Sequence, residues 1–339
     1  MRFDRDAMLE HFGDRYHEVE FRGPGPARRL SLWHTLRKQF VRDEYEHNTW
    51  IDDWYSAEVD DDIQAIGAEI QPDIVLAEYV FFSKALLRFP ADVLKVIDTH
   101  DRFGNRFQMF QSHGVKPAWL SAFPADEMRC LARADRVIAI QNADAAYFRR
   151  RLGSRVYTVG HRSAVKMVPF PSFNRALLFV GGYNAINVDA LSFCVEEILP
   201  RIRLRHRDAE LLIVGALADM APDAPGVRKI GPLEDLDTAY ALARIVVNPC
   251  RFGTGLKTKN VEAMAYGRAL VTTTHGAEGL EAAVGKALLV ADNAEAFAAA
   301  VCELLDESPK VDELSAEGQK FVSRWNAEQD QALWSTFDI

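Results

Sequence analysis

Residues Asn248–Gly267 read NPCRFGTGLKTKNVEAMAYG and carry the clearest structural signal in the chain. The apolar run RIVVNP leads into it, and the apolar run ALVTT follows it. A strand, a loop, a helix and a second strand in this order are typical of a parallel sheet that helices cover on both faces. The loop then lies at the carboxyl end of a strand, which is where ligands bind in such sheets.

The helix of this stretch is predicted to run from about Leu256 to Tyr266. Val261, Met264 and Ala265 have the spacing of a buried stripe on such a helix. Gly267 is placed to end the helix, because glycine adopts the left-handed backbone of a helix C-terminus without steric strain. The N-terminus of the helix therefore adjoins the loop.

The loop combines backbone freedom with positive charge. Gly253 and Gly255 allow positive φ and a close approach of the backbone to a ligand. Arg251, Lys257 and Lys259 add formal charge beside the partial positive charge of a helix N-terminus. This combination suits an anion, and it indicates a phosphate or diphosphate site.

One acid, Glu262, stands on the same helix. Thr258 and Lys259 precede it by four and three residues, so they lie one turn away. A carboxylate one turn behind a phosphate site can accept two hydrogen bonds from the vicinal hydroxyls of a ribose, which would make the ligand a nucleoside diphosphate. The alternative is a surface Lys259–Glu262 pair with ordinary turn glycines. A Walker A loop is disfavoured, because the run GLKT lacks the first glycine of that motif.

Composition sets wider limits. The chain has 339 residues and a formal charge of −9, which suggests two soluble domains. An acidic chain is a poor general binder of nucleic acid. The four cysteines contain no C-x-x-C pair, so we predict free thiols in a reducing compartment and neither a zinc site nor a disulfide framework. There is no signal-like segment and no apolar run of 18 residues, so we expect a cytoplasmic protein, with peripheral contact at the inner face of a membrane left open.

The second half of the chain alternates apolar runs with helix-like segments. Six strands are predicted, at residues 176–182, 210–215, 227–231, 244–249, 269–273 and 287–291. The first half is similar but weaker, with strands predicted at 17–21, 73–79, 94–100, 136–140 and 155–160. This alternation predicts an α/β protein with two doubly wound, Rossmann-like domains that face each other across a cleft.

The predicted domains are 1–165, on the acceptor side, and 175–320, on the donor side, with a linker at 161–174. Residues 321–339 are expected to form a helix that packs back on the first domain. The chain opens with a helix-like segment where a doubly wound domain normally opens with a strand, so the first strand is expected to be absent.

Four segments resemble one family. FGTGLKTKNVEAMAYGRALVTTTHGAEGL resembles the donor-nucleotide half of retaining bacterial glycosyltransferases of the "group 1" family, which have the two-domain GT-B fold. LLFVGGYNAINVDALSFCVEEILPRIRLRHRDAELLIVGA resembles the opening of the same half. LKVIDTHDRFGNR and ADRVIAIQNADAAYFRR resemble parts of the first domain. The resemblance spans about residues 60–325.

The resemblance implies roles for single residues. Glu262 matches the family glutamate that binds the ribose, and His100 matches a histidine that faces the transferred sugar. Arg251 and Lys257 would bind the diphosphate. Thr254 stands where the family has the first glutamate of an E-x7-E pattern, so other groups must hold the sugar. The further residues implied in donor binding are Gly181, Gly182, Gly253, Thr254, Gly255, Leu256 and Thr258.

The family also carries an arginine and a lysine after the first strand of the donor domain. The corresponding segment here, GGYNAINVDA, has neither. The cations of the later loop are therefore more necessary in this chain.

Three acids are weaker candidates for contacts with the sugar or the acceptor. Glu78 and Asp101 end strands of the first half, and Glu278 lies in the turn Gly276–Leu280. The alternatives are solvated strand ends and a tight turn. Arg102 and Arg106 follow Asp101 and could meet an acidic acceptor, although pairing with local acids is favoured.

The resulting expectation is a retaining hexosyltransferase of polysaccharide biosynthesis. It would move a sugar from a nucleoside diphosphate sugar to a glycan or lipid-linked acceptor, without a metal or other cofactor and without nucleic acid. Two alternatives stay open: a non-catalytic glycosyltransferase-like binding subunit, and a sugar-nucleotide epimerase of the same fold.

Overall fold

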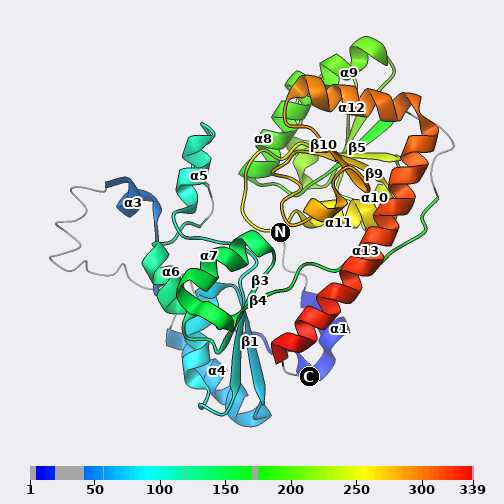
Figure 1. Cartoon of the computed structure of the whole chain (residues 1–339). Coiled ribbons are helices and arrows are strands. Elements are labelled where there is room, and N and C mark those ends of the chain that lie inside the picture. The colour runs from blue at the N-terminus through cyan, green and yellow to red at the C-terminus, as the bar shows by residue number, and fades with distance from the viewer. Residues whose placement is uncertain (1–4, 20–41, 56, 119, 170–174, 338–339) are drawn as a thin grey trace. The chain divides into compact units, whose positions relative to one another are not determined.

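The structure is a computed structural model that describes residues 5–19, 42–55, 57–118, 120–169 and 175–337 (Figure 1). The chain forms two compact units. The first comprises Met1–Arg106, Leu120–Ile138 and Phe148–Val156, and the second comprises Phe107–Trp119, Ala139–Tyr147 and Tyr157–Ile339. The domain boundaries proposed from the sequence stay predictions.

The second unit is built on a six-stranded sheet, in which all neighbouring strands pair in parallel. The strands are β5 (Ala176–Val180), β6 (Glu210–Val214), β7 (Val227–Gly231), β8 (Ile245–Asn248), β9 (Ala269–Thr272) and β10 (Leu288–Val290). Their order is β10-β9-β8-β5-β6-β7. All six strands predicted for this half of the chain are confirmed.

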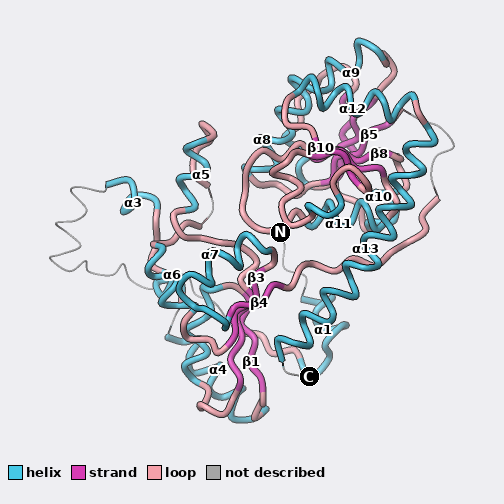
Figure 2. The backbone as a smooth tube through the Cα atoms, in the orientation of Figure 1, coloured by secondary structure: helices cyan, strands magenta, loops and turns pink. Residues whose placement is uncertain are grey.

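Helices cover both faces of this sheet (Figures 1 and 2). They are α8 (Ala185–Phe193), α9 (Leu199–Arg205), α10 (Leu236–Tyr240), α11 (Thr258–Ala265), α12 (Ala294–Asp306) and α13 (Ser308–Phe337). Alternate side chains of a strand point to opposite faces. Leu177 and Phe179 accordingly join the core under α8, α9 and α12, whereas Leu178 joins the core under α10 and α11.

A smaller sheet lies mainly in the first unit. Its strands are β1 (Ile74–Glu78), β2 (Leu94–Asp98), β3 (Arg136–Ala139) and β4 (Val156–Thr158), in the order β1-β2-β3-β4. The pairs β1–β2 and β2–β3 are parallel. The other helices are α1 (Arg5–Phe12), α3 (Arg42–His47), α4 (Ala57–Ile70), α5 (Arg106–Ser112), α6 (Pro124–Leu131) and α7 (Asn142–Leu152). Four strands predicted for this half are confirmed.

The strand predicted at residues 17–21 is wrong for its described part. Residues 17–19 form no strand, and residues 20 and 21 lie outside the described residues. A strand forms only where its backbone pairs with a neighbouring strand, and residues 17–19 pair with none. The contact of Glu18 is local instead: its side chain accepts a hydrogen bond from Arg5 of α1 at 2.6 Å.

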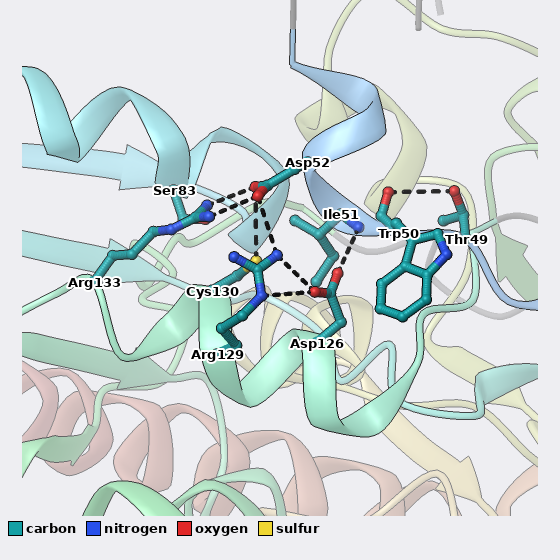
Figure 3. Close-up of polar contacts among 9 residues, drawn as sticks. All are labelled: Thr49, Trp50, Ile51, Asp52, Ser83, Asp126, Arg129, Cys130 and Arg133. Atoms are coloured by element: carbon teal, nitrogen blue, oxygen red, sulfur yellow. Dashed lines mark hydrogen bonds and ion pairs between the residues drawn. The ribbon is translucent and has the colours of Figure 1, made fainter. Parts of the chain in front are cut away.

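Four charged side chains join the 3₁₀ helix Ile51–Trp54 to α6 (Figure 3). We call Asp52, Asp126, Arg129 and Arg133 the paired cluster. Asp52 accepts two hydrogen bonds from Arg133, both at 2.7 Å, and one from Arg129 at 3.0 Å. Burial acts to raise the pKa of Asp52, but the two guanidinium groups outweigh burial and lower it to about 2.

The second carboxylate of the paired cluster is equally well satisfied. Asp126 is 2% exposed and accepts hydrogen bonds from the Ile51 backbone N–H at 2.8 Å and from Arg129 at 2.6 Å. Every charge in the cluster therefore has an opposite charge in contact with it. Such a cluster fixes one segment against another, but it has no unmatched charge to offer a ligand.

Two further predictions can be compared with the structure. The four cysteines are buried free thiols, as predicted. Among the described residues, no helix combines the length and the apolar character that crossing a membrane requires.

In the second unit, helix α13 is hydrogen-bonded to the segment before β5. Trp325 Nε1 donates to the His161 carbonyl at 2.8 Å, and the Gln329 side chain accepts from the Gly160 N–H at 2.6 Å. Packing of residues 321–339 on the first domain stays a prediction.

Candidate functional site

The strand order of the second unit places two loops at one point. The chain moves outward from β5 through β6 to β7, and then crosses back to β8, which pairs with the other side of β5. In doubly wound sheets the ligand crevice opens where the order reverses, beyond the carboxyl ends of the strands. The loops after β5 and β8 flank this reversal, and they contain the glycines and the cations singled out in the sequence.

The loop after β5 makes a close backbone contact. Gly181 donates its N–H to the Val214 carbonyl at 2.9 Å, and Gly215, with a φ of +99°, packs against the Gly181 carbonyl. A Cβ atom on Gly215 would lie 2.4 Å from that carbonyl oxygen. Only glycine fits, so the carboxyl ends of β5 and β6 approach each other closely at the base of the loop.

Buried amides fix the position of α11. Asn248, at the end of β8, donates to the Asn260 side chain at 2.8 Å, and Asn260 donates to the Gly276 carbonyl at 2.7 Å. Asn248 and Asn260 are both 0% exposed. The end of a strand, the first turn of α11 and the turn after β9 are therefore joined by one chain of hydrogen bonds, which holds the helix N-terminus in place.

Helix α11 begins later than predicted and ends as predicted. It starts at Thr258 because Lys257 has a non-helical backbone, and Leu256 is buried in the core before it. At the other end, Gly267 has a φ of +61° and donates to Met264, and the next N–H, of Arg268, donates to Ala263. This is a Schellman ending. The predicted stripe of Val261, Met264 and Ala265 is fully buried.

Two of the predicted diphosphate ligands have local partners. Arg251 donates to Asp189 of α8 at 2.6 and 3.0 Å and lies over the ring of Phe193, and its bond to Asp189 raises the pKa of the guanidinium. The Lys257 ammonium donates to the Gly255 carbonyl at 2.9 Å. Arg251 is thus neutralised by a carboxylate, whereas Lys257 supports the loop that carries Gly253 and Gly255.

Lys259 is not among the diphosphate ligands predicted from the sequence, which were Arg251 and Lys257. Its ammonium donates to the Asn187 side-chain oxygen at 2.7 Å and lies 5.4 Å from the centre of the Phe179 ring. No carboxylate forms an ion pair with it among the residues that the structure describes, so the surface Lys259–Glu262 pair is not formed. The side chain is partly exposed, yet surrounding protein displaces enough water to lower the pKa of the ammonium to about 8.

Asn187 connects this lysine with the loop after β5. Its amide nitrogen donates to the Gly182 carbonyl at 2.8 Å while its oxygen accepts from Lys259. The cation of α11 therefore reaches the segment GGYNAIN, which has no cation of its own. One signal in the sequence pointed to Lys259, its place in the first turn of the helix, but the partner lies 72 positions away in the chain.

Glu262 lies one turn beyond Lys259. Its carboxylate accepts a long hydrogen bond of 3.4 Å from Tyr240 and lies 3.9 Å from His161 Nε2. Burial, followed by the charge of Glu262, raises the pKa of Tyr240 well above its usual value, so Tyr240 remains a neutral donor. The Glu262 side chain is 20% exposed, which leaves the carboxylate able to accept further hydrogen bonds.

Other predicted residues lie near these. Gly253 and Gly255 have φ values of +140° and +72°, in keeping with the freedom expected of them. Thr258 is the first residue of α11, and Thr254 lies in the loop before it. Glu278 pairs with His275 Nδ1 at 3.0 Å.

The first unit brings together a separate set of predicted residues. Glu78 and Asp98 are register partners at the ends of β1 and β2, and the His100 ring contacts the Glu78 carboxylate. Potential ligand atoms of these three residues lie within 4.8 Å of one another, so they could hold a metal ion. Burial raises the pKa of Asp98. The predicted absence of a metal stays a prediction.

Residues 174–307 match the family model for "Glycosyl transferases group 1". This match identifies a group 1 glycosyltransferase domain in the chain. The resemblance to the group 1 family is thereby confirmed for these residues, whereas retention and a bacterial source stay predictions. The glycosyltransferase domain contains β5 to β10 together with Lys259 and Glu262. No curated protein matches the chain in sequence.

Solved structures similar to the chain are GT-B glycosyltransferases. TarM has a TM-score of 0.65 at 12% identity, over 82% of this chain and 58% of TarM. HepE of Anabaena, solved with UDP and glucose, has a TM-score of 0.61 at 14% identity, over 84% of this chain and 81% of HepE. Sucrose-phosphate synthase of Thermosynechococcus elongatus has a TM-score of 0.63 at 18% identity, over 83% of this chain and 78% of the synthase. At these identities the similarity shows the fold, which is the predicted GT-B fold of two parallel-sheet α/β domains.

Proposed function

We propose that this protein transfers a sugar from a nucleoside diphosphate sugar to a glycan or lipid-linked acceptor, with retention at the anomeric carbon. The proposal draws on the group 1 domain at residues 174–307 and on the similarity to HepE, which was solved with UDP-glucose. TarM of S. aureus was solved with UDP, fondaparinux and a GlcNAc-glycerol, which is the basis for a glycan acceptor.

The observation that carries the proposal is the charge of Lys259. An ammonium is expensive to hold in protein surroundings when its polar partner is a neutral amide. Lys259 is nevertheless held there, at the N-terminal turn of α11, where the helix adds about half a positive charge. A diphosphate supplies the negative charge that this arrangement lacks. Glu262, one turn further on, then accepts hydrogen bonds from the ribose hydroxyls.

The chemistry follows from where charge develops. As the bond between the anomeric carbon and the diphosphate breaks, its electron pair passes to the diphosphate, and the sugar becomes oxocarbenium-like. Lys259, Lys257 and the N–H groups at the start of α11 stabilise the leaving diphosphate, as preorganised donors do. The acceptor oxygen bonds to the anomeric carbon on the face that the diphosphate leaves, and its proton passes to a diphosphate oxygen. We assign His100 to contact with the transferred sugar.

The wider parts of the proposal rest on the sequence resemblance. They are a hexose as the transferred sugar, a role in polysaccharide biosynthesis, a bacterial source, and a cytoplasmic location with peripheral contact at the membrane. The proposed reaction uses no metal. The proposed domains are the acceptor side at residues 1–165 and the donor side at 175–320.

The test is a calorimetric titration with UDP, GDP, dTDP and CDP. We expect one of them to bind, and Lys259→Met to weaken it by about 2–5 kcal/mol, which is at least about 30-fold in Kd. Lys286→Met, which removes an exposed lysine of the same domain, serves as the matched control and should bind as the wild type does.

Other results of this titration, and of assays with the matching nucleotide sugars, would contradict the proposed function or favour one of its alternatives. If none of the four nucleotides binds at millimolar concentration, the donor site does not exist and the proposal is wrong. If a nucleotide binds but its sugars are neither transferred nor hydrolysed, the chain is the non-catalytic binding subunit that Thr254 allows, because Thr254 replaces a family glutamate. Conversion of the donor sugar without any acceptor would indicate an epimerase.

A further inference from the structure

The first unit contains a buried cation, Arg106, two of whose hydrogen-bond donors have no acceptor among the described residues. The Arg106 side chain, at the start of α5, is 7% exposed. Its Nε and Nη1 atoms are buried, and neither finds a hydrogen-bond acceptor among the described residues. It forms an ion pair with Asp101, at 3.7 Å from Nη2 to Oδ2. Buried donors without acceptors are rare in folded proteins and cost stability, so Arg106 differs from the guanidinium groups of the paired cluster.

The gap between Arg106 and Asp101 has the dimensions of a bridged contact. A separation of 3.7 Å is too long for a direct hydrogen bond. A single hydroxyl can span it, because a hydroxyl donates to a carboxylate and accepts from a guanidinium at the same time. The Asp101 side chain is 23% exposed, so such a group can enter beside it.

An aromatic side chain stands next to this pair. Tyr79, directly after β1, is 38% exposed, and its ring lies 4.6 Å from the His100 ring and 6.1 Å from the Phe103 ring. Phe103 also stacks under the Arg106 guanidinium, at 5.5 Å. Tyr79 and His100 both have positive φ values, +64° and +53°, which residues other than glycine rarely adopt. Strained backbone of this kind gathers at ligand sites, because the rest of the fold must hold it.

The charges decide which ligand fits. Burial raises the pKa of the Tyr79 hydroxyl, and the charges that act most on it are those of Asp101, Glu78, Arg106 and Asp98. The charges around the Tyr79 hydroxyl are thus three carboxylates and one guanidinium, of which only Asp101 pairs with Arg106, and an anionic ligand would add a further negative charge. A sugar hydroxyl is neutral and both donates and accepts, and a sugar ring also has an apolar face that can lie on an aromatic ring.

We propose that Tyr79, Asp101 and Arg106 form a subsite for an uncharged sugar ring of the acceptor. The ring lies against Tyr79, and one of its hydroxyls bridges Asp101 and Arg106. The inference rests on the proposed function only in that it calls this sugar the acceptor, because the binding itself needs no nucleotide. Arg106 is here a specificity residue for the acceptor and has no part in the donor site.

The experiment is saturation-transfer NMR of the full chain without nucleotide. The probes are the methyl glycosides of glucose, mannose and galactose, with methyl glucuronide as the acidic arm. We expect a neutral glycoside to bind, and Arg106→Gln to weaken it at least about 10-fold, the size expected for a lost charged hydrogen bond. Tyr79→Leu should weaken it several-fold. Arg88→Gln removes a guanidinium that pairs with Asp60 elsewhere in this unit, and it should leave sugar binding unchanged.

The outcomes separate this subsite from the donor site. Loss of glycoside binding with nucleotide binding intact supports the subsite. The inference is overturned if no neutral glycoside binds, if the glucuronide binds better than the neutral sugars, or if Arg106→Gln binds as the wild type does. Should Arg106→Gln fail to fold, Arg106→Lys keeps the charge without the planar fork, and Tyr79→Leu changes an exposed side chain, so these two variants then carry the test.

Discussion

The paired cluster in the first unit and Lys259 in the second show two ways of holding charge inside a protein. In the paired cluster, Asp52 and Asp126 are matched by Arg129 and Arg133, and the pKa of Asp52 falls to about 2. Lys259 contacts an amide and an aromatic ring instead, and the pKa of its ammonium falls to about 8. Pairing stabilises the charged form of the first group, and burial destabilises the charged form of the second. A charge without an opposite charge beside it therefore indicates a ligand site, whereas a fully paired network indicates a structural role.

The largest effect is expected from breaking the paired cluster. Asp126→Ala removes the charged hydrogen bonds from the half-exposed Arg129 and leaves the buried Ile51 N–H without its acceptor, and together these losses should cost about 3–5 kcal/mol. Urea denaturation measures the loss. Glu18→Gln, which removes the acid of an exposed pair with Arg5, should leave the unfolding midpoint unchanged. An equal effect of the two substitutions would show that the cluster is no different from a surface pair.

The next effect separates the two halves of the donor site. Glu262→Gln should weaken binding of the preferred nucleoside diphosphate by about 1.5–3 kcal/mol, because it removes charged hydrogen bonds to the ribose. Pyrophosphate has no ribose, so Glu262→Gln should leave its affinity unchanged. Lys259→Met should weaken the binding of both pyrophosphate and the nucleotide. Calorimetry with both ligands gives the answer, and Glu295→Gln, at an exposed acid, is the control. Equal weakening of pyrophosphate by Glu262→Gln would contradict the ribose assignment.

The pH dependence of binding tests the charge of Lys259 directly. The pKa of this ammonium in the free protein is lowered to about 8, and a bound diphosphate must raise it. Affinity should therefore be constant below pH 8 and fall by about tenfold per pH unit above it, until the pKa of the bound state is reached. Titrations from pH 7.5 to pH 9 show this break, because the last phosphate proton, with a pKa of about 6, is almost completely lost over this range. A flat profile in the wild type would mean that Lys259 does not meet the diphosphate.

A smaller effect is expected from the residue that aims the lysine. Asn187→Ala removes the acceptor that holds the Lys259 ammonium and the donor to the Gly182 carbonyl. Because the ammonium itself remains and only the bond that positions it is lost, nucleotide affinity should fall less than in Lys259→Met, by about fivefold or about 1 kcal/mol. The measurement is the same titration. Affinity equal to that of Lys259→Met would instead make Asn187 a ligand in its own right.

The smallest effect is expected for the folding stability of Lys259→Met. Lys259→Met should not destabilise the fold, because it removes a charge that the folded state disfavours. The sign follows from the lowered pKa: the wild type should gain stability as the pH rises from 8 toward 10.5, where folding favours the neutral amine, and the variant should not. Denaturation at pH 7 and pH 10 measures both. A loss of stability at pH 7 comparable to that of Asp126→Ala would place Lys259 among the structural charges.

Much of the second unit could be predicted from local pattern alone. Five of the six strands are short apolar runs ended by glycine or polar residues, and β7 (VRKIG) alternates less clearly, but all six are confirmed. The end of α11 at Gly267 is also visible in the sequence, because a glycine directly after a buried stripe is typical of a helix C-terminus. The start of α11 lies two residues beyond the predicted start at Leu256. That residue is apolar enough for the helix pattern, but its side chain is used in the core before the helix begins.

In the first unit, local pattern is a weaker guide. The run at 17–21 has the composition of a strand, yet its described residues, 17–19, pair with no other strand. The sequence favours Arg106 as a partner of nearby acids. The structure does place it by Asp101, but too far for a hydrogen bond and with two buried donors unsatisfied among the described residues. Spacing in a sequence shows which groups are near, but not whether their geometry allows them to bond.

The strands, the glycine loop and the cations near it can be recognised in the sequence, because each depends on neighbours within a few residues. Tertiary structure decided which cation keeps an unmatched charge. Arg251 and Lys259 look alike in the sequence, but α8 gives Asp189 to one and Asn187 to the other. That choice depends on the strand order, which reverses between β5 and β8 and brings α8 beside the loop after β8. Contacts across 62 and 72 residues follow from the packing of the sheet, and local sequence does not encode them.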